Sequence, residues 1–182
     1  ALLRWMRSYN FPELFDEQNG FDPEIQELIP APNLRMGDNR QVFGGTEAST
    51  PLALPEINQF SEDASIPGTI GSSSMRRIGC YLNEVIKMNS DQRNFRLFSP
   101  DETYSNKLDA VFESTSRAFV LPKKPTDKDM KSDGRVIEML SEHSLQGLMQ
   151  GYILTGRHAI FASYEAFIQI VASMADQYAK FL

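Results

Sequence analysis

Cysteine is nearly absent from the sequence, which has Cys80 alone among its 182 residues. A disulfide scaffold is therefore excluded, and a lone thiol is typical of a reducing compartment such as the cytoplasm, where we expect this protein. Basic residues are also few, because 18 Lys and Arg stand against 24 Asp and Glu, a net charge of -6. Phosphate neutralisation needs clustered cations and no basic run occurs, so the composition argues against general nucleic-acid binding.

Long apolar runs are missing as well. No stretch approaches the roughly 20 residues that cross a bilayer, and the N-terminus lacks the layout of a secretory signal, so no membrane partner is expected. The chain does have 41% hydrophobic and 10% aromatic residues, enough apolar material to offset chain entropy. It starts at Ala1 within one amphipathic pattern and ends at Leu182 within another, which suggests a piece of a larger protein.

Proline divides the chain into two parts. Seven of the ten prolines precede Gly71, and each removes a backbone donor, so long helices and central strands are not expected there. Asp22 is a suitable N-cap for a short helix with Pro23 at its first position. The apolar side chains of this part cannot easily bury one another. Residues 1–71 are therefore predicted to be an interdomain connector that lies on other surfaces.

From Ser72 onward, helical and extended patterns alternate. Helices are predicted over 72–89, 108–112, 145–154 and 164–182, strands over 95–98, 118–121, 135–140 and 159–162, and a charged loop over 122–134. This alternation is typical of an α/β fold with a mostly parallel sheet flanked by helices. We therefore expect a domain over 72–182 that is truncated at its C-terminal end.

The loops after the strands at 95–98 and 135–140 are the candidate sites, because ligands of parallel sheets bind beyond the carboxyl ends of the strands. The first loop, Ser99–Lys107, is rich in hydroxyl, amide and ammonium groups before a helix, an arrangement that suits an anion. A capping segment with a solvated face is the alternative, and spacing alone favours it.

The second loop contains Ser141, Glu142 and His143. A carboxyl group at the end of an apolar strand is partly desolvated and can hold or share a proton. Alternatively, Ser141 caps a helix and Glu142 lies in its first turn, and spacing alone favours this structural role. A metal site in this chain is not expected, because His143 and His158 lack a third ligand at suitable spacing.

Several motifs occur in an order that closely resembles the thiamine-diphosphate-dependent phosphoketolases, which act on xylulose 5-phosphate and fructose 6-phosphate. The resemblance extends over nearly the whole chain, and its strength lies in the combination. The matching segments are Trp5–Tyr9, Pro12–Phe15, Ser99–Leu108, Gly134–His143, Gly151–His158 and Ser163–Phe167.

The resemblance implies a fold and a reaction. Phosphoketolases resemble transketolases in having three α/β domains, and this chain would be the connector and the middle, pyrimidine-binding domain. The family cleaves xylulose 5-phosphate, and often fructose 6-phosphate, with inorganic phosphate to give acetyl phosphate and a shortened aldose phosphate. Many members have Arg where this chain has Lys107. Lysine keeps the positive charge but lacks the two-pronged hydrogen-bonding geometry of the arginine guanidinium group.

The resemblance also assigns residues. Glu142 matches the carboxyl group that contacts the aminopyrimidine ring nitrogen of thiamine diphosphate and thereby activates the cofactor. Tyr164 matches the aromatic residue beside that ring, and Phe167 would extend the apolar wall. Ser105 and Lys107 match positions that bind the phosphate of the sugar. Leu148, Gln150, Ala159 and Arg40 differ from the usual family residues, which indicates a divergent branch.

The resemblance finally implies partners. An upstream domain, absent from this chain, holds the cofactor diphosphate through a divalent ion, normally Mg2+, and the cofactor lies between two subunits. We therefore expect a homodimer or higher oligomer that includes the remaining domains, and no activity from this chain alone. The alternative is a non-catalytic transketolase-like subunit with an interaction or regulatory role.

Overall fold

The computed structural model describes residues 1–182 apart from 19, 40–41, 43–47 and 181–182. The chain divides into two compact units, Ala1–Phe43 and Gly44–Leu182. The predicted division between residues 71 and 72 stays a prediction. None of the helices in the described part of the chain combines the length and the apolar character that crossing a membrane requires.

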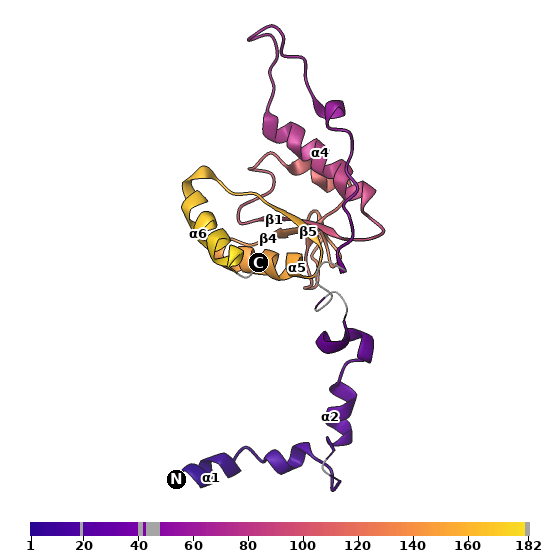
Figure 1. Ribbon diagram of the computed structural model, residues 1–182, viewed down its shortest axis with the longest axis vertical. Coiled ribbons are helices and arrows are strands. Elements are labelled where there is room, and N and C mark those ends of the chain that lie inside the picture. The colour runs from indigo at the N-terminus through magenta and orange to yellow at the C-terminus, as the bar shows by residue number, and fades with distance from the viewer. Residues whose placement is uncertain (19, 40–41, 43–47, 181–182) are drawn as a thin grey trace. The chain divides into compact units, whose positions relative to one another are not determined.

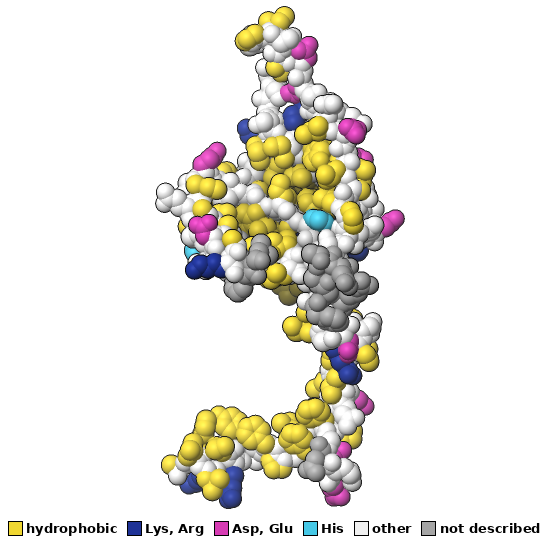
Figure 2. Space-filling view, in the orientation of Figure 1, with side chains coloured by type: hydrophobic (Ala, Val, Ile, Leu, Met, Phe, Trp, Pro, Cys, Tyr) yellow, Lys and Arg dark blue, Asp and Glu magenta, His cyan; other side chains and the backbone are white. Residues whose placement is uncertain are grey.

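The first unit consists of short helices without a core. They are α1 (Leu2–Arg7), η1 (Phe11–Leu14), α2 (Pro23–Leu28), η2 (Pro32–Leu34) and η3 (Met36–Asp38). The Asp22 side chain accepts a hydrogen bond of 2.9 Å from Glu24 N, and Pro23 begins α2, so the predicted cap is confirmed. None of the described residues of this unit is buried, and Figure 2 shows apolar side chains along its surface.

The second unit begins with a segment that adheres to the domain core. Asn89 holds this segment through both polar atoms of its amide, because Ala53 N donates to its Oδ1 (3.0 Å) and its Nδ2 donates to Ala53 O (2.8 Å). Leu52 packs against the core, and the His158 ring bonds to Thr50 O at 2.8 Å. A short 3-10 helix, η5 (Ile57–Phe60), follows.

Five parallel strands form one sheet in the order β3-β2-β4-β1-β5. The strands are β1 (Phe95–Ser99), β2 (Arg117–Ala118), β3 (Met130–Lys131), β4 (Val136–Glu138) and β5 (His158–Phe161). Leu97 of the central strand β1 is in register with Val136 of β4 and with Ile160 of β5. The predicted α/β fold with a parallel sheet is confirmed.

Helices cover both faces of the sheet (Figure 1). Helix α4 (Ser74–Met88) and the 3-10 helix η6 (Asp109–Glu113) lie on one face, and α5 (Glu142–Leu154) and α6 (Ile168–Ala179) on the other. Alternation along β1 directs Phe95 and Leu97 to the α4 face and Phe98 to Tyr152 of α5.

The main core lies on the α4 face, where Leu97, Val111 and Val136 are fully buried. Burying one such side chain contributes about 1.5–3 kcal/mol, so this layer fixes the sheet against α4. Gly79 of α4 permits the close approach of η6, since a Cβ there would lie 3.1 Å from Leu108 Cα. The core also includes Leu82, Val85, Ile86, Phe95 and Leu108.

Four sequence-based predictions of elements were wrong in extent or type. The helix predicted over 164–182 is the 3-10 helix η7 (Glu165–Phe167) followed by α6, which begins only at Ile168. The strand predicted over 118–121 ends at Ala118, and the strand predicted over 135–140 ends at Glu138. The helix predicted over 108–112 is the five-residue 3-10 helix η6. Apolar character misled the strand predictions, because Leu121 and Leu140 are exposed to 66% and 86%.

The segment 122–134, predicted to be a loop, contains a short strand and ends where its backbone passes very close to that of residues 116–117. Its residues Met130–Lys131 form β3 and pair with β2. Gly134 then passes so close to β2 that a Cβ there would lie 2.3 Å from Ser116 O and 2.4 Å from Arg117 C. Only glycine fits this crossing without movement of the backbone.

Candidate functional site

Three loops leave the carboxyl edge of the sheet side by side. Because all strands are parallel and β1 lies between β4 and β5, the loops after these three strands begin at one edge. Pairing continues beyond the strands, since Met139 N donates to Ser99 O (3.2 Å) and Ala162 N to Phe98 O (2.9 Å). The edge therefore gathers the loop of Ser105 and Lys107, the loop before Glu142, and the loop of Tyr164 and Phe167.

The loop after β1 folds into consecutive turns. Asn106 N and Ser105 Oγ both donate to Glu102 O, at 3.2 and 2.8 Å, and Leu108 N donates to Thr103 O at 3.0 Å. The helix expected after this loop is only the five-residue 3-10 helix η6, so a helix dipole would contribute little to anion binding here. Anion binding by this loop would depend on its own side chains.

Lys107 has an unusual backbone conformation. Its φ is +60°, in the left-handed region, which costs a non-glycine residue roughly 1–2 kcal/mol. The side chain is exposed, and its ammonium makes no hydrogen bond or ion pair with any described residue. Ser105 is exposed too. The loop thus presents a hydroxyl and an uncompensated positive charge to solvent.

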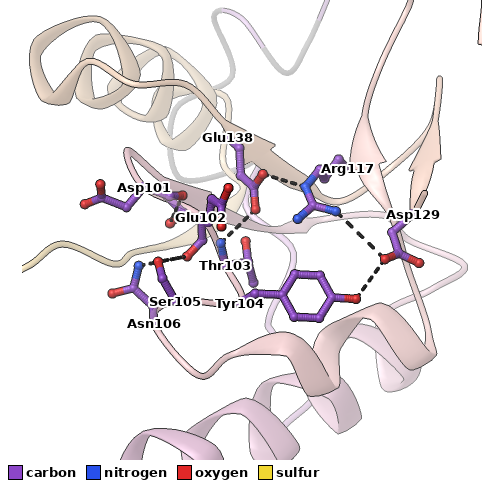
Figure 3. Close-up of polar contacts among 10 residues, drawn as sticks. Asp101, Glu102, Thr103, Tyr104, Ser105, Asn106, Arg117, Asp129 and Glu138 are labelled. Carbon is purple, nitrogen blue, oxygen red and sulfur yellow. Dashed lines mark hydrogen bonds and ion pairs between the residues drawn. The ribbon is translucent and has the colours of Figure 1, made fainter. Parts of the chain in front are cut away.

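A network of charged groups that the sequence did not predict fastens this loop to two strands (Figure 3). Glu138, the last residue of β4, accepts hydrogen bonds from Thr103 N (2.8 Å) and from Arg117 Nε of β2 (2.5 Å). Arg117 Nη1 lies 3.9 Å from Asp129 Oδ2, and Tyr104 donates to the same oxygen at 2.9 Å. Glu138 therefore fixes the backbone of Thr103, and Asp129 fixes the side chain of the next residue, Tyr104.

Aromatic rings complete the network. The Arg117 guanidinium lies 4.5 Å from the Phe112 ring centroid and 5.5 Å from that of Tyr104, within the range of cation–π attraction. The hydrogen bond to Asp129 raises the pKa of Tyr104 above the ordinary phenol value. A lone carboxylate inside the apolar 136–140 segment was the one sequence signal for Glu138; Arg117 and Asp129 had none.

Glu142 occupies the first turn of α5. Ser141 precedes it as the N-cap, and its hydroxyl accepts a hydrogen bond from Ser144 N at 3.3 Å. The structural role considered from the sequence is therefore present. The Glu142 side chain is nevertheless half-buried and has no hydrogen bond or ion pair within the described part of the chain. Its carboxyl group remains available to a ligand.

Tyr164 precedes the short helix η7 (Glu165–Phe167) after β5, and Phe167 is the last residue of that helix. Phe167 N donates to Tyr164 O at 3.0 Å, which closes the turn. The two residues are 36% and 38% exposed, so their rings are open to contact. Neither ring makes an aromatic or hydrogen-bond contact with Glu142 among the described residues, and the three share the sheet edge through their loops.

The remaining candidates from the sequence have ordinary surroundings. His143 is exposed, and no group of three His, Cys, Asp or Glu residues among those described could hold a metal ion. Of the positions that differ from the usual family pattern, Gln150 donates to Met174 O at 3.2 Å and Leu148 is 51% exposed. Arg40 lies outside the described residues.

Comparison with known proteins decides the family. The sequence model described as D-xylulose 5-phosphate/D-fructose 6-phosphate phosphoketolase matches residues 76–182, which include all three loops. The chain belongs to the phosphoketolase family. The model of the N-terminal domain of these phosphoketolases matches residues 1–47.

The sequences of individual phosphoketolases are similar to this chain along nearly its whole length. The probable phosphoketolase of Bradyrhizobium diazoefficiens is 48% identical over 178 residues, which is 98% of this chain and 22% of that protein. Probable phosphoketolase 2 of Rhizobium meliloti is 47% identical over 181 residues, and the probable phosphoketolase of Clostridium acetobutylicum 45% over 183, each covering 100% of this chain and 23% of the relative. The chain thus spans less than a quarter of these relatives.

Proposed function

We propose that this chain is the part of a thiamine-diphosphate-dependent phosphoketolase that supplies Glu142 to the cofactor. The complete enzyme would cleave xylulose 5-phosphate, and possible further substrates such as fructose 6-phosphate, with inorganic phosphate to give acetyl phosphate and an aldose phosphate. Family membership supports the reaction class. The observation that carries the residue assignment is the half-buried Glu142 carboxyl group without a described partner at the carboxyl edge.

The residues at this edge fit the aminopyrimidine ring of the cofactor. A flat ring with polar edges needs a hydrogen-bonding group for the edge and an apolar surface for the face. Glu142 offers the first, and the accessible rings of Tyr164 and Phe167 offer the second. Glu142 follows strand β4 at the start of α5, and Tyr164 and Phe167 follow strand β5; only β1 separates these two strands in the sheet.

When bound, thiamine diphosphate supplies the carbon nucleophile and the electron sink for cleaving the ketose. The role of Glu142 is to hold a proton at a carboxyl oxygen and share it with the ring nitrogen. Its partial burial limits the water that competes for this contact. Tyr164 and Phe167 orient the ring by packing against it.

Ser105 and Lys107 would bind the phosphate group of the sugar. The ammonium of Lys107 supplies charge, and the Ser105 hydroxyl can donate a hydrogen bond once it leaves Glu102 O. The Glu138–Arg117 network would not contact the phosphate itself. It fixes the turn that carries Ser105 and Lys107. The strained backbone of Lys107 is consistent with a functional placement.

The remaining parts of the enzyme belong to the proposal as well. Mg2+ and the cofactor diphosphate would be held by a domain outside this chain, and the assembly would be a cytoplasmic homodimer or higher oligomer. The fragment alone would then be inactive. The second candidate, a non-catalytic transketolase-like subunit, is not favoured by any observation at the site.

Glu142→Ala in the full-length polypeptide tests the proposal. We expect acetyl phosphate formation to fall by at least about 100-fold, the lower range for loss of acid–base catalysis, while the protein stays folded. Glu84→Gln on α4, where Glu84 pairs with Lys87 at 3.3 Å on the surface, is the matched control and should keep full activity.

Two results would contradict the assignment. Turnover at the wild-type rate in Glu142→Ala would exclude Glu142 from catalysis. Failure of the wild-type full-length polypeptide to bind thiamine diphosphate in calorimetry would favour the non-catalytic subunit instead.

A further inference from the structure

A cavity lined by arginines lies at the amino edge of the sheet, opposite the candidate site. Its volume is about 620 Å³, within the usual range of small-molecule sites. Arg93 precedes β1, Arg135 precedes β4 and Arg157 precedes β5, while Arg96 projects from β1 itself on the α5 face. Four guanidinium groups therefore converge from separate segments in a chain whose net charge is -6.

Carboxylates contribute little to this cavity. No Asp or Glu is among its described lining residues. Arg96 makes no hydrogen bond or ion pair with any described residue, and its Nε is buried without a partner. Arg93 pairs with Asp133 at 3.4 Å, but both side chains are about half exposed, so solvent weakens that pair.

Arg135 is held in place by neutral acceptors. Its Nε donates to Phe95 O at 3.0 Å, and its Nη2 donates to Tyr152 Oη at 2.8 Å and to Arg93 O. Burial lowers the pKa of Arg135, and the charges of Arg96 and Arg93 lower it further against the opposite effect of Tyr152. An arginine stays charged despite such shifts, so a half-buried charge has no counter-ion among the described residues.

Tyr152 of α5 organises the cluster. The guanidinium groups of Arg96 and Arg157 lie 5.5 and 5.6 Å from its ring centroid, and its hydroxyl binds Arg135. Arg157 is further oriented by its bond to Thr155 Oγ1 at 2.7 Å. The like charges are thus held near one another before any anion arrives, which reduces the ordering cost of binding one.

A second cavity of about 340 Å³ shares Arg93 and Arg135 with the first but also contains Asp133. The negative charge of the Asp133 carboxylate makes that cavity less suitable for an anion. The larger cavity combines positive charge with apolar walls from Phe98, Ile137 and Leu148.

We propose that the larger cavity binds a small anion with phosphate groups, and that Arg93, Arg96 and Arg135 are its ligands. Planar guanidinium groups match phosphate oxygens in pairs, and half-buried guanidinium groups without a carboxylate partner, such as those of Arg96 and Arg135, gain most from such a contact. The apolar wall has room for the organic part of a phosphate ester. This site is separate from the candidate active site, because the two lie at opposite edges of the sheet.

Hydrogen–deuterium exchange of the full-length polypeptide, titrated with inorganic pyrophosphate, tests the proposal by location. We expect protection in peptides that cover 91–98 and 150–158. Arg96→Gln should raise the pyrophosphate concentration at half-protection about tenfold or more, the effect of losing one charged hydrogen-bond donor. Arg76→Gln, a change at a 62% exposed arginine on α4, is the control and should leave it unchanged.

The same titration with adenosine diphosphate distinguishes the possible sources of the phosphate. Tighter binding than pyrophosphate would identify an organic phosphate that uses the apolar wall, and equal or weaker binding an inorganic one. If Arg96→Gln fails to fold, Arg93→Gln at the exposed rim replaces it with the same expectation. The proposal is overturned if neither anion protects these peptides, as it would be if another part of the enzyme fills the cavity, or if the arginine variants bind as the wild type does.

Discussion

Replacing Arg117 by Met should release the loop that carries Ser105 and Lys107. The substitution removes the 2.5 Å hydrogen bond to Glu138 and the cation–π contact with Phe112 at 4.5 Å. The side chains of Arg117 and Glu138 are only 16% and 20% exposed, so solvent replaces these contacts poorly.

The magnitude follows from these two contacts. A hydrogen bond between charged groups contributes about 1.5–3 kcal/mol and a cation–π contact about 0.5–1 kcal/mol. The free energy of opening the loop should therefore fall by about 2–4 kcal/mol, which is about 30-fold to several hundred-fold faster amide exchange. Glu138→Gln should act through the same pair, so the double variant should show a coupling energy of at least about 1 kcal/mol.

Hydrogen–deuterium exchange of peptides covering 101–108 in the full-length polypeptide measures the effect. Arg76→Met is the control, because Arg76 pairs with Asp109 at 3.6 Å on the surface and its loss should cost at most about 1 kcal/mol. If Ser105 and Lys107 bind substrate, the variant should also raise KM for the sugar phosphate. Unchanged exchange in Arg117→Met would refute the view that this network fixes the loop.

Two further predictions concern single residues of the same region. The Asp129 hydrogen bond raises the pKa of Tyr104 and so favours the neutral phenol; its contribution should be complete below about pH 10 and lost as the pH rises through the folded-state pKa. Difference absorbance of Tyr104→Phe against wild type should show this late titration, and a normal phenol titration would contradict it. Gly134→Ala should destabilise the β2–β4 crossing by about 1–3 kcal/mol, seen as faster exchange at 115–118 and 134–138; exchange at the wild-type rate would contradict the close contact.

The sequence allowed the architecture to be predicted wherever the signal was local. Spacing of apolar residues located α4 and α5, and the Asp22–Pro23 pair located the start of α2. Alternation of helices and strands predicted the parallel sheet, and with it the edge where the candidate loops meet. These signals depend on neighbours within a few positions of each other.

The parts that were not predicted depend on strand pairing. Glu138 meets Arg117 because β4 pairs with β2, and Asp129 joins them because the two-residue strand β3 adds to that edge. No periodicity in a charged, proline-containing loop indicates so short a strand. Local propensity also cannot distinguish an apolar strand from the exposed continuation at Leu140.

The arginine cavity was missed for the same reason. Arg93, Arg96, Arg135 and Arg157 are scattered along the sequence, so a search for basic runs finds nothing. The register of β1 with β4 and β5 brings them to one edge. The four arginines therefore form a positively charged cluster in the folded chain, although they form no cluster in the sequence.

The central claim is that Glu142 activates thiamine diphosphate. The most direct test is the rate at which the C2 proton of the bound cofactor exchanges with deuterium in the full-length polypeptide, measured by quenched-flow NMR. We predict that Glu142→Gln still binds the cofactor but exchanges this proton at least about 100-fold more slowly than the wild type. Exchange at the wild-type rate in Glu142→Gln would contradict the claim.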